Sequence, residues 1–176
     1  MKVFWKLAAL SAVAAITLLP SSTFAENEDQ NTVEWPSIVG VITAQGVNNP
    51  VSHNINSGTF AWSARSGHAR INLETGRAYF EVEGLVINGT SFSGTPGPIT
   101  AVTGTLVCNA GTNTESTHDT PAVALSGRGN ARFSGHLANG PIECGNPLFL
   151  IRIAVPEGAA GRWIATGAQR SFSDSD

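Results

Sequence analysis

Lysine, cysteine and tyrosine are scarce in this chain of 176 residues. It has two cysteines, one tyrosine and two lysines, and both lysines, Lys2 and Lys6, lie in the first six residues. Charged residues make up only 13% of the chain, and the formal net charge is −3. A net acidic chain is a poor partner for nucleic acid or an anionic membrane surface, so neither partner is expected. The hydrophobic share of 41% argues against intrinsic disorder.

Long apolar runs are also missing, apart from one of 13 residues at 7–19. That run is too short to cross a hydrocarbon core about 30 Å thick, so no membrane span is predicted. It follows Lys2 and Lys6, ends at Pro20, and precedes the small residues Thr23 and Ala25. This arrangement is typical of a secretory signal peptide over 1–25. We therefore expect a secreted or periplasmic protein.

The two cysteines, Cys108 and Cys144, both follow the signal segment. An even pair in a chain bound for an oxidising compartment predicts a disulfide, and two cysteines allow only one pairing. The alternative is a pair of buried free thiols. A disulfide that closes the loop between Cys108 and Cys144 stabilises a fold by roughly 4 kcal/mol in the chain-entropy model.

The remaining chain is predicted to be one domain. The polar, acidic segment 26–34 is expected to be a disordered leader, 35–170 a single folded domain, and 171–176 a flexible acidic tail. No segment after the signal keeps a helical apolar period. Short β-branched and aromatic runs alternate instead with Gly, Pro, Asn and Ser, which predicts strands and turns. The expected strands are 37–46, 58–65, 67–75, 77–87, 99–108, 121–127, 129–137, 147–155 and 161–168.

Two of these segments alternate cleanly between apolar and polar residues. In the first, Ala69 and Ile71 share one side, and in the second Ala78, Phe80 and Val82 do so. Each strand should then have one buried face and one solvated face, as in an antiparallel sheet. The short glycine-containing turn at 74–76 predicts a hairpin between them. About nine such strands predict an all-β fold, an antiparallel β-sandwich with a closed barrel as the alternative.

Established catalytic motifs are absent from the sequence. There is no His-Glu-x-x-His, Gly-x-Ser-x-Gly or Cys-x-x-Cys, and no phosphate-binding glycine loop. The remaining acid/base candidates are the adjacent His118 and Asp119, with Glu143 as a third group, because a carboxylate raises the basicity of a neighbouring imidazole. Glu81 and Glu83 share a strand face and could supply the paired carboxylates that glycoside hydrolysis requires. For each set, a solvated surface position is the competing interpretation.

Metal and ligand sites have equally few candidates. His68 and His136 each follow a glycine on a predicted strand and could hold a divalent metal if the sheet brings them together, whereas His53 and His118 fall in loops. No cofactor is implied. The aromatic side chains that could contact a ligand are Trp62, Trp163 and Tyr79, with burial in the core as the alternative. Residues 88–90 form a glycosylation sequon in which Asn88 could carry a glycan. The alternative is a turn, because Asn-Gly is also a turn signal.

A set of motifs in the last 75 or so residues resembles a loose group of uncharacterised secreted bacterial all-β proteins. The motifs are Leu-Val-Cys at 106–108, Phe-Ser-Gly-His at 133–136, Cys-Gly-Asn-Pro followed by an aliphatic strand at 144–152, and Trp-Ile-Ala at 163–165. The resemblance implies a one-disulfide fold and lends no activity. A weaker likeness, through 67–73 and 79–85, is to chordin-type secreted β domains. The His-x-His element of that family has no counterpart here.

These observations favour an exported, non-enzymatic β-sandwich that acts as an adhesion, envelope or extracellular binding module. Function on an all-β scaffold usually lies in long loops, which here are 47–57, 88–98 and 109–120. A glycan or a cell-envelope component is the expected partner. Two alternatives stay open: a secreted hydrolase using the His118 and Asp119 loop, and a divalent-metal-binding protein using His68 and His136.

Overall fold

The computed structural model describes residues 31–52, 54–137, 141–155 and 159–169. All regular structure in this part of the chain is β-strand, as the sequence predicts. The strands are β1 (Thr32–Trp35), β2 (Ser37–Gly40), β3 (Ala61–Ser63), β4 (Ser66–Asn72), β5 (Arg77–Glu83), β6 (Val86–Asn88), β7 (Ala101–Cys108), β8 (Ser116–Asp119), β9 (Val123–Ala124), β10 (Ala131–His136), β11 (Pro147–Ala154) and β12 (Ala160–Ala168). No helix long and apolar enough to span a membrane occurs among these residues.

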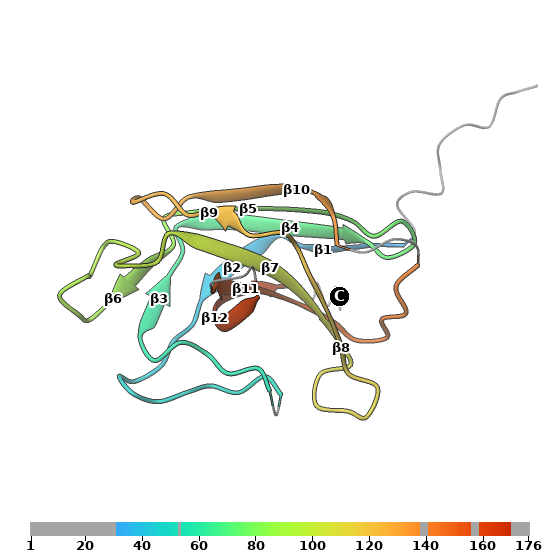
Figure 1. Cartoon of the computed structure of the whole chain (residues 1–176), viewed down its shortest axis with the longest axis horizontal. Coiled ribbons are helices and arrows are strands. Elements are labelled where there is room, and N and C mark those ends of the chain that lie inside the picture. Colours follow the sequence, from blue (N-terminus) through green and yellow to red (C-terminus); the bar gives the residue numbers. More distant parts are fainter. Residues whose placement is uncertain (1–30, 53, 138–140, 156–158, 170–176) are drawn as a thin grey trace, which may run out of the picture.

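The strands form two main sheets and one small one. The first sheet has the order β1-β4-β5-β10, and the second has the order β2-β12-β11-β7-β8, with β9 also paired to β7. Strands β3 and β6 form a separate two-stranded pair. In Figure 1 the first sheet is the upper layer, and β7, β11 and β12 lie beneath it. The layered all-β architecture confirms the sandwich-like fold class.

Aromatic side chains fill the space between the two main sheets. Phe80 from the first sheet and Phe149 from the second lie 5.6 Å apart between ring centroids, and Trp35 is the same distance from Phe149. All three are at most 1% exposed. Glycine on the facing strands makes room for these rings, because a Cβ on Gly104 would lie 2.7 Å from Phe80 and one on Gly167 would lie 2.5 Å from Trp35.

The alternating residues of β4 and β5 determine which side of the first sheet is buried. Ala69, Ile71, Ala78, Phe80 and Val82 all point inward, as the sequence predicts. The predicted hairpin is also confirmed, since β4 pairs antiparallel with β5 and Ile71 lies opposite Ala78. Strand β11 begins at Pro147 and lies between β7 and β12, which agrees with its apolar composition.

Two strands lie where the sequence predicts irregular chain. Strand β1 begins at Thr32, inside the segment 26–34 that the sequence predicts to be a disordered leader. Residues 26–30 lie outside the described residues. Main-chain pairing with β4 and burial of Trp35 hold β1 in place. Strand β8 lies inside the predicted loop 109–120 and pairs with β7.

Candidate binding face on the β1-β4-β5-β10 sheet

The outward side of the first sheet collects polar and charged residues from all four strands. The register places Glu34 opposite Arg70, Arg70 opposite Tyr79, and Tyr79 opposite Ser134. In the next row, His68 lies opposite Glu81, and Glu81 lies opposite Arg132. These two rows exist because alternate residues of a strand share a face. We call this surface the outer face.

Tyr79 lies at the centre of the outer face and is surrounded by cationic and aromatic groups. The guanidinium carbons of Arg70 and Arg132 are 5.3 Å and 5.1 Å from the centroid of its ring. The imidazole of His68 stacks on the same ring with centroids 5.3 Å apart. The two arginines come from β4 and β10, the strands on either side of β5. The tyrosine therefore positions both guanidinium groups by cation–π attraction.

The hydroxyl of Tyr79 donates a hydrogen bond to Oε2 of Glu81 at 2.6 Å. This bond raises the pKa of Tyr79, as do desolvation and the negative charge of Glu81, while Arg132 and Arg70 oppose the shift. Tyr79 thus stays protonated near neutral pH and acts as a hydrogen-bond donor. Such a phenol is not a candidate nucleophile or base.

A cleft of about 470 Å³ opens on the outer face. It is lined by Thr32, Glu34, Arg70, Asn72, Thr75, Arg77, Ala78, Tyr79, Ser134, Gly135 and His136. Among the described residues, no carboxylate lies within 4.0 Å of Arg70, Arg77 or Arg132. The cleft volume falls in the range of small-ligand sites. The outer face therefore combines a ligand-sized hollow with arginines that have no ionic partner in the described chain.

The three aromatic candidates have different surroundings. Trp62 is 4% exposed, and Trp163 is 8% exposed and donates from its indole nitrogen to the carbonyl of Asn49. Rings buried to this extent present no face to a ligand, so the core interpretation holds for both. Tyr79 alone lies at a cleft. The sequence pattern alone does not single out Arg70, Arg77 and Arg132 as site residues, because no motif connects them.

The acid/base candidates His118, Asp119 and Glu143 are not brought together. His118 and Asp119 are successive residues of β8 and so point to opposite sides of the strand. Glu143 is exposed in the segment beside Cys144. Among the described residues, no hydrogen bond or ion pair joins any two of the three, and none of them lines the cleft. The arrangement lacks the convergence that acid/base catalysis requires.

Asp119 has a structural contact instead. Its Oδ1 accepts a hydrogen bond from the hydroxyl of the buried Thr105 and lies 3.9 Å from a guanidinium nitrogen of Arg152. Arg152 also donates to the carbonyl oxygens of Gly161 and Ala160, each at 2.7 Å. Burial lowers the pKa of Arg152, and the Asp119 carboxylate opposes that shift. Asp119 thus anchors an arginine that ties β11 to β12.

Replacing Asp119 with alanine is expected to lower the free energy of unfolding by about 1–2 kcal/mol, because the buried Thr105 hydroxyl loses its acceptor and the Arg152 guanidinium loses its ion-pair partner. Denaturant unfolding measures the effect. Asp119→Asn should lose less, since its amide oxygen can still accept from Thr105. Glu143→Ala removes an exposed acid and should change stability by less than about 0.5 kcal/mol. A larger loss at Glu143 than at Asp119 would contradict the assignment.

The metal candidates His68 and His136 are far apart. His68 lies opposite Glu81 and His136 opposite Arg77, which are four residues apart on β5, or about 13 Å along the strand. The two histidines also belong to different strands, β4 and β10, which are separated by β5. No group of three or more His, Cys, Asp or Glu residues in the described ranges could hold a metal ion. His53 lies outside the described residues.

The carboxylates Glu81 and Glu83 are engaged separately. Glu81 accepts from Tyr79, whereas Glu83 accepts from the guanidinium of Arg65 at 2.8 Å and the hydroxyl of Ser66 at 3.2 Å. These bonds, with the charge of Arg65, lower the pKa of Glu83. A glycosidase acid needs a raised pKa, and Glu83 has the opposite shift.

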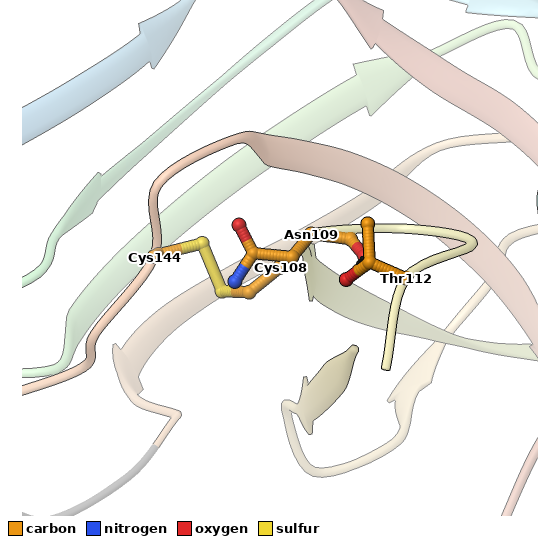
Figure 2. Close-up of a disulfide and its surroundings, with 4 residues drawn as sticks. All are labelled: Cys108, Asn109, Thr112 and Cys144. Atoms are coloured by element: carbon orange, nitrogen blue, oxygen red, sulfur yellow. Dashed lines mark hydrogen bonds between the residues drawn. A yellow bond between two sulfur atoms is a disulfide. The ribbon is translucent and has the colours of Figure 1, made fainter. Parts of the chain in front are cut away.

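The predicted disulfide between Cys108 and Cys144 is present. Figure 2 shows that it joins the end of β7 to the segment before β11, with Asn109 and Thr112 on the adjoining turn. The backbone N–H of Asn109 donates to the carbonyl of Asn146 at 3.2 Å beside the bond. Such a disulfide is compatible with an oxidising compartment. Asn88, the sequon residue, is exposed at the end of β6.

The titration of Tyr79 tests the outer-face geometry directly, because the chain has a single tyrosine. We expect its midpoint above the ordinary value of about 10, measured by the near-ultraviolet absorbance of the phenolate. A raised folded-state pKa stabilises the fold fully below about pH 10, and this contribution is lost as the pH rises through the folded value.

Glu81→Gln should lower the midpoint of Tyr79, because the carboxylate that raises it is gone and the two arginines that lower it stay. Glu83→Gln is the matched control, since that carboxylate pairs with Arg65 and Ser66. An equal shift in both variants would contradict a specific contact between Tyr79 and Glu81.

Comparisons with protein-family models, with curated proteins and with solved structures found no match to this chain. The resemblance to secreted one-disulfide β proteins therefore stays a prediction from the sequence, and functional conclusions depend on the geometry of the outer face.

Proposed function

We propose that the chain is an exported β-sandwich that works as a non-enzymatic binding module for a glycan or another component of the cell envelope. The observation that supports this most directly is the cleft of about 470 Å³ on the outer face, with Arg70 and Arg77 in its lining. Among the described residues, no carboxylate oxygen lies within 4.0 Å of a side-chain nitrogen of either arginine. The export signal pattern and the disulfide support the compartment. The separation of His118, Asp119 and Glu143 favours binding over catalysis.

The proposed surface differs from the loops expected from the sequence. The cleft residues belong mainly to β1, β4, β5 and β10, whose positions are set by main-chain pairing. Side chains on a paired sheet are held more rigidly than side chains on long loops, which lowers the entropy cost of binding. The outer face is thus pre-organised for a ligand.

The test is retention on a panel of immobilised glycans and purified envelope polysaccharides. The full chain, expressed with its signal segment and purified oxidised, should bind at least one member, and the double variant Arg70→Gln with Arg77→Gln should lose that binding. Arg128→Gln removes the same charge from an exposed turn and is the control. If the double variant is still retained, the outer face is not the binding surface. Turnover of a glycoside or ester panel that His118→Ala abolishes would overturn the non-enzymatic function.

A further inference from the structure

We infer that the outer face binds an acidic polysaccharide of the polyuronate class, through carboxylate groups held by Arg70, Arg77 and Arg132. The inference rests on the proposed function and names the chemistry of its ligand. It is carried by the contrast between a chain with a net charge of −3 and a face where Arg70 and Arg77 line one cleft and Arg132 joins Arg70 over the ring of Tyr79.

The three arginines are suited to bind oxyanions. Each guanidinium offers a planar fork of N–H donors that matches the geometry of a carboxylate. Arg70 and Arg77 line the cleft, and Arg132 approaches Tyr79 from the neighbouring strand. Because no described carboxylate lies within 4.0 Å of any of them, a bound anion would not displace an ion pair within the described part of the chain.

Tyr79 is a positioning residue for two of these arginines. Its ring lies 5.3 Å and 5.1 Å from the guanidinium carbons of Arg70 and Arg132, and its hydroxyl is fixed by Glu81. A long arginine side chain held on a ring loses less rotamer freedom when it binds. With its ring surrounded by Arg70, Arg132 and His68, Tyr79 orients cations and is not the stacking platform for a neutral sugar.

The character of the cleft favours a polysaccharide over a peptide or a lipid. None of the large exposed hydrophobic residues of the described chain lines it, so it lacks the apolar pocket that peptide side chains or acyl chains need. Its lining includes Ser134 and the carboxylate of Glu34, groups that exchange hydrogen bonds with sugar hydroxyls. The lining reaches across four neighbouring strands, about 14 Å, which suits an extended chain of sugars.

Glu34 makes the site selective for a ligand that carries hydroxyl groups next to its carboxylates. It lies opposite Arg70 in the register, so an acceptor and a cation stand side by side on adjacent strands. A uronate sugar presents a carboxylate next to hydroxyl groups and can satisfy both. A polymer of carboxylates without hydroxyls would meet the negative charge of Glu34 and bind less tightly.

The experiment measures binding of the oxidised full chain to three soluble polymers: polygalacturonate, the same polymer with its carboxylates methyl-esterified, and poly-glutamate. Calorimetry should give binding to polygalacturonate that is at least about tenfold tighter than to either other polymer, and it should weaken as salt is raised. Arg70→Gln and Arg77→Gln should each weaken it about tenfold, a loss typical of one charge-assisted hydrogen bond. Arg128→Gln should stay within about twofold of wild type.

The positioning role of Tyr79 has its own readout. Tyr79→Phe keeps the ring and should bind within about twofold of wild type, whereas Tyr79→Ala leaves every arginine in place and should still bind about tenfold more weakly. A loss shared equally by both variants would show that the hydroxyl matters rather than the ring, and would overturn the cation–π argument. Far-ultraviolet circular dichroism confirms that each variant is folded.

The outcomes separate this inference from the proposed function. No binding to polygalacturonate, or equal binding to its methyl ester, overturns the acidic polysaccharide. If a neutral glycan of the panel is bound and the Arg70 and Arg77 double variant loses it, the binding module stands while this inference fails. If poly-glutamate binds as tightly as polygalacturonate, the partner is an acidic polypeptide and the inference of a polysaccharide ligand is wrong. Equal losses of affinity for polygalacturonate in Arg128→Gln and Arg70→Gln would show that binding depends only on net charge. That result would contradict a specific site on the outer face.

Discussion

Replacing both cysteines with serine, C108S with C144S, is expected to lower the free energy of unfolding by about 4 kcal/mol. The bond joins residues 36 apart in sequence, and the loop it closes contains β8, β9 and β10. Without it the unfolded chain gains the entropy of an open loop of that length. A loss of this size is a large part of the stability of a domain, which is commonly 5–15 kcal/mol.

The structural position of the disulfide adds to this expectation. The segment that contains Cys144 leads from β10 in the first sheet to β11 in the second, so the bond fixes a crossing between the layers (Figure 2). The neighbouring Ile142 is 7% exposed and donates its N–H to the carbonyl of Leu73. Cys108 is fully buried at the end of β7. Opening the bond should therefore also loosen the contact between Ile142 and the turn after β4.

Denaturant unfolding of the oxidised wild type, the reduced wild type and the double serine variant measures the effect. The reduced protein and the serine variant should agree, since both lose the same loop closure. A decrease below about 1 kcal/mol in the serine variant would contradict a stabilising role for the bond. Agreement of the two with a large decrease would assign the whole effect to the cross-link rather than to the serine side chains.

Much of the fold follows from local sequence pattern. Period-2 alternation in β4 and β5 predicts both the hairpin and the buried face, because main-chain geometry alone sends alternate side chains to opposite sides. The glycine-containing turn at 74–76 predicts where the chain reverses, and Gly76 has a φ of 69° there. The disulfide can be predicted from the count of two cysteines together with the sequence pattern of an export signal.

The strands that the sequence missed are stabilised by distant partners. Strand β8 consists of Ser-Thr-His-Asp, a composition typical of loops, and it forms because β7 offers a free edge for main-chain hydrogen bonds. Strand β1 lies in an acidic, polar context but pairs with β4, about 35 residues later in the chain. Propensity is a weak guide when tertiary pairing supplies the hydrogen bonds.

The candidate site illustrates the same limit. The outward positions of Arg70, Arg77 and Tyr79 can be predicted from alternation in β4 and β5. The approach of Arg132 cannot, because it depends on β10 pairing next to β5, and strand order leaves no local signal. The burial of Trp62 and Trp163 likewise depends on which layer covers each ring, and aromatic residues occur both in cores and at binding surfaces.

Phe80→Ala is expected to lower the free energy of unfolding by about 3–5 kcal/mol. Phe80 is fully buried, and its ring centroid lies 5.6 Å from that of Phe149 and 6.1 Å from that of Phe133. It also fills the space above Gly104, where the second sheet has no side chain. Removing the ring leaves a cavity between two paired sheets, which can collapse only partly because main-chain hydrogen bonds fix both layers.

Phe92→Ala is the matched control, because it makes the same truncation at a side chain that is 47% exposed, and it should cost less than about 1 kcal/mol. Denaturant unfolding of both variants, with the disulfide intact, gives the two differences. Phe80 and Tyr79 are successive residues that point to opposite faces of β5, so Phe80→Ala also tests whether the outer face needs a rigid layer beneath it. Equal decreases in the free energy of unfolding for the two variants would show that the aromatic core between the sheets is not the main source of stability. The sheet beneath the cleft on the outer face would then be held by main-chain pairing alone.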